Sequence, residues 1–194
     1  FLNNHDIERD HGLSEFDVAH RFVASFVWNL PFGRGERWGD DASGWKQALI
    51  GGWQLNGIWL WQGGMPMTIA ARDVGWVLDS WGVNRADIVG DIHAGGGTVE
   101  EWFNTAAFAQ PAFGEFGSSG RSILRLPGIH NLDLGLFKNF FIGPTTLQFR
   151  VEAFNALNHP QFSWVSPNLW LPNFGVVTNA RDGRIVQLGV KLLW

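Results

Sequence analysis

The chain has 194 residues, of which 16% are charged, and it contains 25 Gly, 12 Trp and 16 Phe but neither Cys nor Tyr. A hydrophobic content of 45% excludes an intrinsically disordered chain. The lack of Cys excludes disulfides, thiolate metal sites and Cys nucleophiles. A net charge of −4 argues against an electrostatic nucleic-acid binder.

Apolar residues alternate with polar ones in five segments, at the period of two that is typical of β-strands. They occupy the even positions of 18–30 and the odd positions of 49–61. They then occupy the even positions of 129–141, the odd positions of 145–154 and the even positions of 184–194. The pattern predicts five strands, each with one apolar face.

A tight hairpin is expected between the third and fourth of these segments. Its loop is Gly143-Pro144, and Gly at the first position favours a type II′ turn because it adopts a positive φ easily. The turn predicts a register that pairs residue 140 with 147, 138 with 149 and 136 with 151. Both apolar sets then share one face, which a shifted register would not allow.

The longest uncharged run, between Lys46 and Arg72, exceeds the length of a membrane helix. It contains several Gly, one Pro and evenly spaced polar residues, so we interpret it as a strand followed by a turn.

The connections between strands differ in length at the two ends. Residues 31–48 and 142–145 join strands at one end, whereas 62–128 and 155–183 join them at the other. Transmembrane barrels combine short periplasmic turns with long extracellular loops. Within the longest loop, Thr98-Val99-Glu100-Glu101 resembles a capping box and predicts a short helix over about 99–107. A soluble β-sandwich is the alternative, although its strands are usually joined by shorter loops.

Six segments carry a likeness to a known family. They are AHRFVASFVWNLPFGRG (19–35), GGWQLNG (51–57), GMPMT (64–68), FGSSGRSILRLPGIHNLDLGLFKNF (116–140), LQFRVEAFNALNHPQF (147–162) and RIVQLGVKLLW (184–194). Together they resemble the C-terminal barrel of TonB-dependent receptors, and most closely the Oar-like group, which often carries an N-terminal carboxypeptidase-regulatory-like domain.

The resemblance implies active import of a scarce solute, such as an oligosaccharide or a metal chelate, across the outer membrane of a Gram-negative bacterium. In this family a plug domain blocks a 22-stranded barrel, and TonB pulls on the plug. The chain contains neither plug nor TonB box. Five strands would leave two open edges, which hydrocarbon does not tolerate. We therefore expect residues 1–194 to be the C-terminal part of a larger receptor barrel, in an all-β antiparallel fold with long extracellular loops and one short loop helix.

The last segment resembles the signal that the barrel assembly machinery reads on outer-membrane proteins. That signal has a polar residue, a Gly, and apolar or aromatic residues with an aromatic at the end. The matching residues here are Gln187, Gly189, Leu192 and Trp194. The usual terminal residue is Phe, so Trp is a modest departure. The alternative is an ordinary last strand of a β domain.

The resemblance also suggests places for solute contact. We expect one set of polar residues to face the barrel lumen, where it could contact the plug or water or form an Arg150–Glu152 ion pair: Asp133, Asn139, Gln148, Arg150 and Glu152. A second set in the long loop could stack and orient a ligand, or could pack the loop: Trp76, Trp81, Trp102, Arg85 and Asp87. Arg121 and Arg125 fit a structural role where the loop returns to the barrel. Lys138 occupies an even position of segment 129–141, on the side expected to face lipid. We expect its aliphatic stem to snorkel, so that the ammonium reaches the membrane–water interface.

No catalytic motif, metal site or cofactor site is expected. His5, Asp6 and His11 match no compact ligand spacing. The partners implied are TonB, the assembly machinery, outer-membrane lipid and a small solute, with no nucleic acid. Two other functions stay open: a soluble, Trp-rich carbohydrate-binding sandwich, and a structural or adhesive outer-membrane protein.

Overall fold

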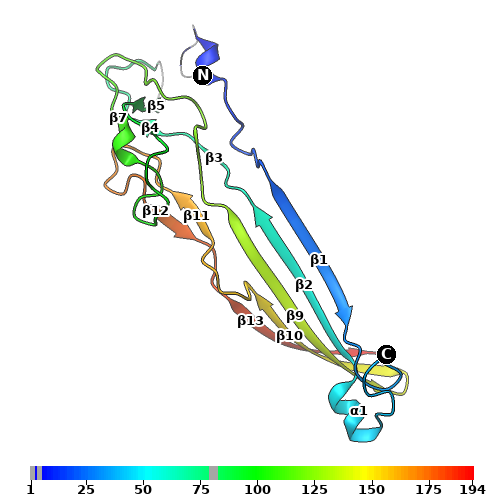
Figure 1. The fold of residues 1–194 in the computed structure, drawn as a ribbon. Helices are drawn as coiled ribbons and strands as arrows, with labels where there is room; N and C mark the ends of the chain where they lie inside the picture. Colours follow the sequence, from blue (N-terminus) through cyan, green and yellow to red (C-terminus); the bar gives the residue numbers. More distant parts are fainter. Residues whose placement is uncertain (1–2, 4–5, 79–82) are drawn as a thin grey trace. The chain divides into compact units, whose positions relative to one another are not determined.

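Five long strands form the main sheet of the computed structural model, which describes residues 3, 6–78 and 83–194. The strands lie in the order β1-β2-β9-β10-β13, and Figure 1 shows them side by side. Their bounds are β1 Arg21–Asn29, β2 Trp53–Gln62, β9 Ile129–Ile142, β10 Thr145–Phe154 and β13 Ile185–Leu193. All five strand predictions are confirmed.

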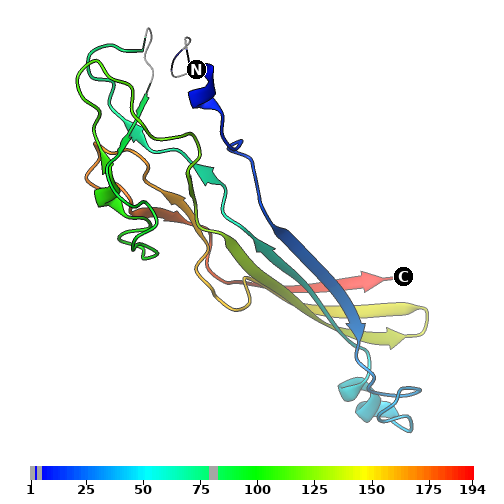
Figure 2. The same ribbon diagram turned by 45° about the horizontal axis from the view of Figure 1, so that its top comes forward.

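The register predicted for the hairpin between β9 and β10 is confirmed. The two strands are antiparallel, and Leu147 lies opposite Phe140 while Val151 lies opposite Leu136. Gly143 has a φ of +59°, as the first position of a type II′ turn requires. Figure 2 shows this hairpin in yellow, beside β13.

The other strand pairs continue the same two faces. On β10 and β13, Leu147 lies opposite Leu192 and Phe149 lies opposite Val190. On β1 and β2, the rings of Phe22 and Trp59 meet edge to face at 5.3 Å. The apolar positions of the five strands therefore share one side of the sheet.

Contact clustering divides the chain into two compact units. The sheet unit comprises Arg21–Trp61, His130–Pro160 and Asp182–Trp194. The loop unit comprises the described part of residues 1–20 together with Gln62–Ile129 and Gln161–Arg181.

The apolar face of the sheet is open. Leu188 of β13 is 76% exposed, and Phe26, Trp61, Phe149 and Val190 are also exposed. The buried hydrophobic cluster of the described residues belongs to the loop unit instead. A sheet that leaves such residues uncovered needs an apolar environment rather than water.

The loop unit has its own core and its own short strands. The strands pair as β3 (Pro66–Met67) with β8 (Leu124–Arg125), β4 (Ala70–Ala71) with β5 (Asn84–Arg85), β6 (Asp87–Ile88) with β7 (Phe108–Ala109), and β11 (Phe162–Val165) with β12 (Val177–Ala180). Ile69 and Val165 are fully buried in the core, where the rings of Phe103, Phe108 and Phe174 meet edge to face. The long connections are therefore folded structure and not open loops.

The short loop helix predicted over about 99–107 is confirmed only in part, because it is shorter than expected. Only a 3-10 turn forms there, η2 (Thr105–Ala107), and a second one, η1 (Ile7–Asp10), lies near the start of the chain. The Thr98 hydroxyl does accept a hydrogen bond from the Glu101 amide at 3.0 Å, as a capping box requires. The next amide, of Trp102, donates to the Gly175 carbonyl instead of to a helical partner. Tertiary contacts thus override the local signal.

The described α-helix lies in another connection of the sheet unit. It is α1 (Gly44–Ile50), between β1 and β2. The helix includes Leu49 and Ile50, the first two residues of the predicted strand 49–61, and β2 begins only at Trp53. No helix in the described ranges is long and apolar enough to cross a bilayer.

Candidate functional site

The five residues predicted to face the lumen lie together on the polar side of the sheet. Gln148 lies opposite Asn139, and the Gln148 amide donates to the Asn139 oxygen at 2.7 Å. The Arg150 Nε in turn donates to the Gln148 Oε1 at 2.6 Å. These contacts form a polar ladder across β9 and β10.

Arg150 is fixed by this ladder and not by its neighbouring carboxylate. Its guanidinium carbon lies 4.8 Å from the centre of the Phe137 ring, a cation–π distance. The suggested Arg150–Glu152 ion pair is not among the salt bridges between described residues. Glu152 lies opposite Gln187 of β13. The planar guanidinium gives this face a fixed positive group.

Asp133 holds the turn that follows β10. Its carboxylate accepts hydrogen bonds from the Asn131 amide at 2.9 Å and from the Asn155 backbone N–H at 2.8 Å. Asn155 is buried with a φ of +49°, and its side chain exchanges hydrogen bonds with the backbone of His159. Sequence reasoning missed Asn155, although Asn directly after a strand is a recognised turn signal.

Trp76 is the most exposed of the ligand-contact candidates that the structure describes. Its side chain is 90% exposed, and its φ of +57° is rare for a residue other than Gly or Asn. The Asp73 carboxylate supports this turn, because it accepts hydrogen bonds from the amides of Val77 and Leu78 at 3.1 and 3.2 Å. An exposed ring on a supported turn is free to stack on a planar or sugar ligand.

Arg85 is used inside the loop unit. It is only 5% exposed, and it donates to the Arg9 carbonyl at 2.7 Å and lies 3.4 Å from the Asp10 carboxylate. Burial lowers the pKa of Arg85, and the nearby Asp10 charge opposes that shift. These contacts favour a structural role for Arg85, whose buried Nε has no hydrogen-bond partner among the described residues.

Asp87 and Trp102 also have partners within the loop unit. The Asp87 carboxylate accepts the Ser118 amide at 2.7 Å, and the Trp102 indole donates to the Arg125 carbonyl at 2.9 Å. Trp102 also packs against the buried cluster. Trp81, the remaining candidate, lies outside the described residues.

The two arginines of the segment 116–140 are placed at the return of the long loop. Arg125 donates to the Gly64 carbonyl at 2.9 Å and pairs with Asp17 at 2.8 Å. Arg121 lies 3.8 Å from Glu15. Both arrangements agree with the structural role expected for them.

Asn84 is a structural position of the loop unit that sequence reasoning missed. It is fully buried, donates to the Glu115 carbonyl at 2.9 Å and accepts from the Gly117 amide at 3.1 Å. It therefore joins two stretches about thirty residues apart. No local pattern marks such a role, because its partners are distant in sequence.

Lys138 does not reach water, contrary to the expected snorkelling. It is only 6% exposed, and its ammonium donates to the Gly51 carbonyl. It also lies 5.2 Å from the Trp53 ring centre and 5.0 Å from that of Phe140. The charge is satisfied by a backbone acceptor and two aromatic faces, so it has no need of water.

The residues of the proposed assembly signal lie on β13 and just after it. Gln187 and Gly189 are on the polar side, opposite Glu152 and Arg150, while Leu192 is on the apolar side. Trp194 follows the strand and is 94% exposed. β13 is at the edge of the described sheet.

Among the described residues, no three His, Asp or Glu side chains form a group able to hold a metal ion. Of the three residues considered earlier, His5 lies outside the described part of the chain, and Asp6 pairs with Arg9 at 3.6 Å.

Comparison with known families agrees with this geometry. The family model described as "Outer membrane beta barrel domain" matches residues 1–187, which is nearly the whole chain. Comparisons with curated proteins and with solved structures give no significant match. The family match fits a sheet with an open apolar face on one side and a polar ladder on the other. The chain belongs to the outer membrane beta-barrel domain family and resides in the outer membrane of a Gram-negative bacterium.

Proposed function

We propose that the chain is part of an Oar-like TonB-dependent receptor that imports a scarce solute, and that it binds and transports without catalysis. The family-like segments named above support this reading, since they cover strands of the sheet and the return of the long loop. The solute class is an oligosaccharide, a metal chelate or a molecule of similar size.

The observation that carries the proposal is the loop unit. A barrel that only anchors a protein needs no more than turns between its strands, but these connections fold around a buried core of their own. In transmembrane barrels the long connections lie outside the cell. A folded connection that presents an exposed Trp76 has the form of a solute-capturing surface.

The polar face of the sheet is the proposed lumen wall. A closed barrel turns one side of each strand to lipid and the other to the lumen. The ladder of Asn139, Gln148 and Arg150 would then offer amide and guanidinium groups to the plug domain or to water.

β13 is the proposed recognition strand for barrel assembly. An edge strand presents unpaired backbone groups that another chain can bind by strand addition. The polar and apolar residues of β13 alternate without interruption from Gln187 to Leu192.

Growth on candidate solutes tests the import function. The gene is deleted in one strain and kept in its parent, and both are also made without TonB. The proposal predicts that growth on the true solute is lost in either deletion, with no further loss in the double deletion. The import proposal would be contradicted if some solutes support growth only when the gene is present, but none of those solutes requires TonB.

An adhesive or structural role is the second candidate. The loop unit exposes large apolar side chains, with Phe113 and Trp76 among the most exposed residues. Such residues are typical of surfaces that bind other molecules. This role predicts loss of surface attachment on deletion of the gene, equal with and without TonB.

The soluble carbohydrate-binding sandwich is set aside. A sandwich buries the apolar face of each sheet against a second sheet. The described sheet leaves that face open, and the family resides in a membrane.

A further inference from the structure

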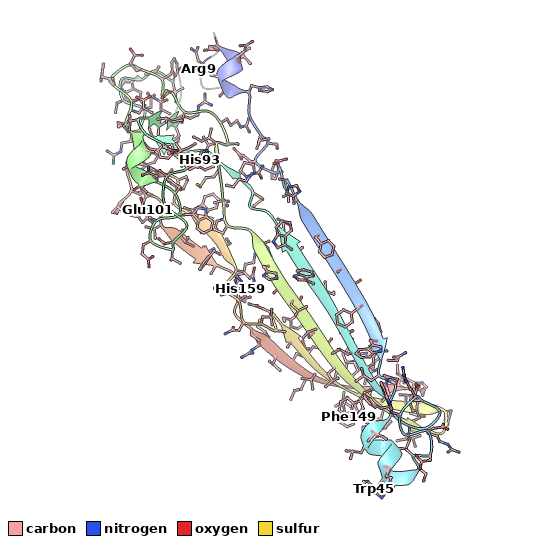
Figure 3. All side chains as sticks on the ribbon, viewed as in Figure 1. Arg9, Trp45, His93, Glu101, Phe149 and His159 are labelled. Atoms are coloured by element: carbon pink, nitrogen blue, oxygen red, sulfur yellow. The ribbon has the colours of Figure 1, made fainter. Side chains whose placement is uncertain are left out.

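A groove of about 540 Å³ lies between α1 and the β9–β10 hairpin, within the sheet unit. Gln47 and Ala48 line it from the helix, and Phe140, Leu147 and Phe149 line it from the strands. Figure 3 shows Phe149 beside α1, with Trp45 on the part of the helix that points away from the sheet.

The strand wall of this groove is part of the apolar face of the sheet. Phe140 lies opposite Leu147, and Phe149 lies opposite Lys138 in the next pair on the same face. The rings of Phe140 and Phe149 meet edge to face at 5.7 Å. The groove is therefore continuous with the surface that an outer-membrane barrel turns to lipid.

The helix wall is held in place by hydrogen bonds to the sheet. The Trp53 indole donates to the Leu49 carbonyl at 2.9 Å, and the Asn139 backbone N–H donates to the Gly52 carbonyl at 2.8 Å. The Lys138 ammonium donates to the Gly51 carbonyl between them. These three contacts fix the C-terminal end of α1, so the groove is formed before any occupant binds.

The outer side of α1 is also apolar. Trp45 is 72% exposed and Leu49 is exposed as well. Trp is enriched where the hydrocarbon meets the polar headgroups, and short helices with exposed apolar residues lie in that plane. In water, the exposed apolar side chains of Trp45 and Leu49 would not stabilise the helix.

We propose that α1 lies in the membrane interface and that the groove holds one acyl chain of a phospholipid. A hydrocarbon chain matches the aromatic and aliphatic side chains that form most of the lining beside Gln47 and Asn139, and it reaches the groove directly from the lipid that covers the rest of the apolar face. The inference rests on membership of the outer-membrane family and does not require solute import.

Photo-crosslinking of the full-length protein tests this site. The protein is reconstituted in phosphatidylethanolamine–phosphatidylglycerol vesicles that contain a phospholipid with a diazirine on one acyl chain. After irradiation, adducts are mapped by mass spectrometry of peptides. We expect adducts on α1 and on the stretch 140–149, in addition to those on the apolar side of β13.

Two matched tryptophan substitutions separate the groove from the general lipid surface. Ala48→Trp fills the groove, and we expect it to lower the adducts on 140–149 at least threefold. Lys46→Trp alters the same helix at a position that does not line the groove, and we expect no change. Ala48→Leu serves as a smaller filling variant if Ala48→Trp does not fold, with a smaller loss in the same direction.

Three outcomes overturn the proposal. Adducts on β13 without any on α1 or 140–149 would mean that water or a protein partner covers the groove. Equal losses of adducts on 140–149 in Ala48→Trp and Lys46→Trp would mean that the groove does not hold the acyl chain. Absence of adducts on β13 as well would contradict the lipid-facing assignment itself, whereas a failure of solute import would leave all of these labelling results unchanged.

Discussion

The Lys138 side chain and the Gly51 backbone are joined by a hydrogen bond from the ammonium to the carbonyl oxygen. The bond ties β9 to the residue that directly follows α1. A cation at the C-terminal end of a helix interacts favourably with the helix dipole. The aromatic rings of Trp53 and Phe140 cover the rest of the charge. The arrangement explains how a lysine is tolerated on the apolar side of a barrel strand.

Replacing Lys138 with Met should loosen α1 while leaving the sheet intact. The substitution keeps an apolar stem but removes a charged hydrogen bond, which contributes about 1.5–3 kcal/mol. We expect amide hydrogen exchange in residues 48–52 to rise by a factor between about ten and about one hundred, because about 1.4 kcal/mol corresponds to a factor of ten. Exchange in β9 and β10 should stay as in the parent protein.

Lys191→Met is the matched control for that variant. Lys191 lies on the polar side of β13, opposite Gln148, and is exposed. It should leave exchange in residues 48–52 unchanged. Equal protection of α1 in Lys138→Met and the parent would show that the hydrogen bond does not hold the helix.

Replacing Arg85 with Met should destabilise the loop unit by about 3–5 kcal/mol, because it breaks the buried charge pair between Arg85 and Asp10. Limited proteolysis of the described residues between 62 and 129 measures the effect, with faster cleavage expected. Arg72→Ala, at an exposed arginine of the same unit, should cleave like the parent. Unchanged cleavage in Arg85→Met, with loss of solute binding, would favour the ligand-contact role instead.

Trp76 and Trp102 should respond differently to substitution. Trp76→Ala removes an exposed ring and should lower uptake of the true solute at least fivefold without faster proteolysis. Trp102→Phe removes the hydrogen bond to the Arg125 carbonyl and should speed proteolysis of the loop unit. Normal uptake in Trp76→Ala would remove this residue from the proposed capture surface.

Assembly of the barrel should depend on recognition of the β13 side chains by the assembly machinery, and less on how those side chains pack within the sheet. A Cβ at Gly189 would meet the Arg150 Cβ at 3.8 Å, an ordinary contact. Gly189→Ala is therefore tolerated by the fold, and any loss of folded barrel would reflect recognition. We expect Trp194→Ala to lower the amount of folded barrel in isolated outer membranes several-fold, measured as the fraction whose gel mobility changes on heating. Leu193→Ala is the control, and we expect it to have little effect.

The strands were predictable because their signal is local and periodic. The sheet turns one side to lipid, so every second residue is apolar, and Gly143 fixed the register of the hairpin. The start of β2 was misplaced because Leu49 and Gly51 continue the same alternation by chance. That extension concealed α1, which is short and held by contacts with the sheet.

The core of the loop unit was not predictable, because its contacts link distant stretches. Phe103 packs against Phe174, and the amide of Trp102 bonds to Gly175. The same contacts decided the candidate site. Arg85 and Trp102 were proposed for their chemistry alone. Only the fold reveals that Arg85 donates to the Arg9 carbonyl and that the Trp102 indole donates to the Arg125 carbonyl.

The alternation of lipid and lumen along β10 is the central claim, and spin labels test it most directly. Cysteine is placed in turn at Gln148, Phe149, Arg150 and Val151 of the full-length protein in vesicles, and each is labelled with a nitroxide. The account predicts high collision rates with oxygen, which partitions into lipid, at 149 and 151. It predicts high rates with a water-soluble nickel complex at 148 and 150. The same reagent preference at all four positions, or the opposite alternation, would contradict the account.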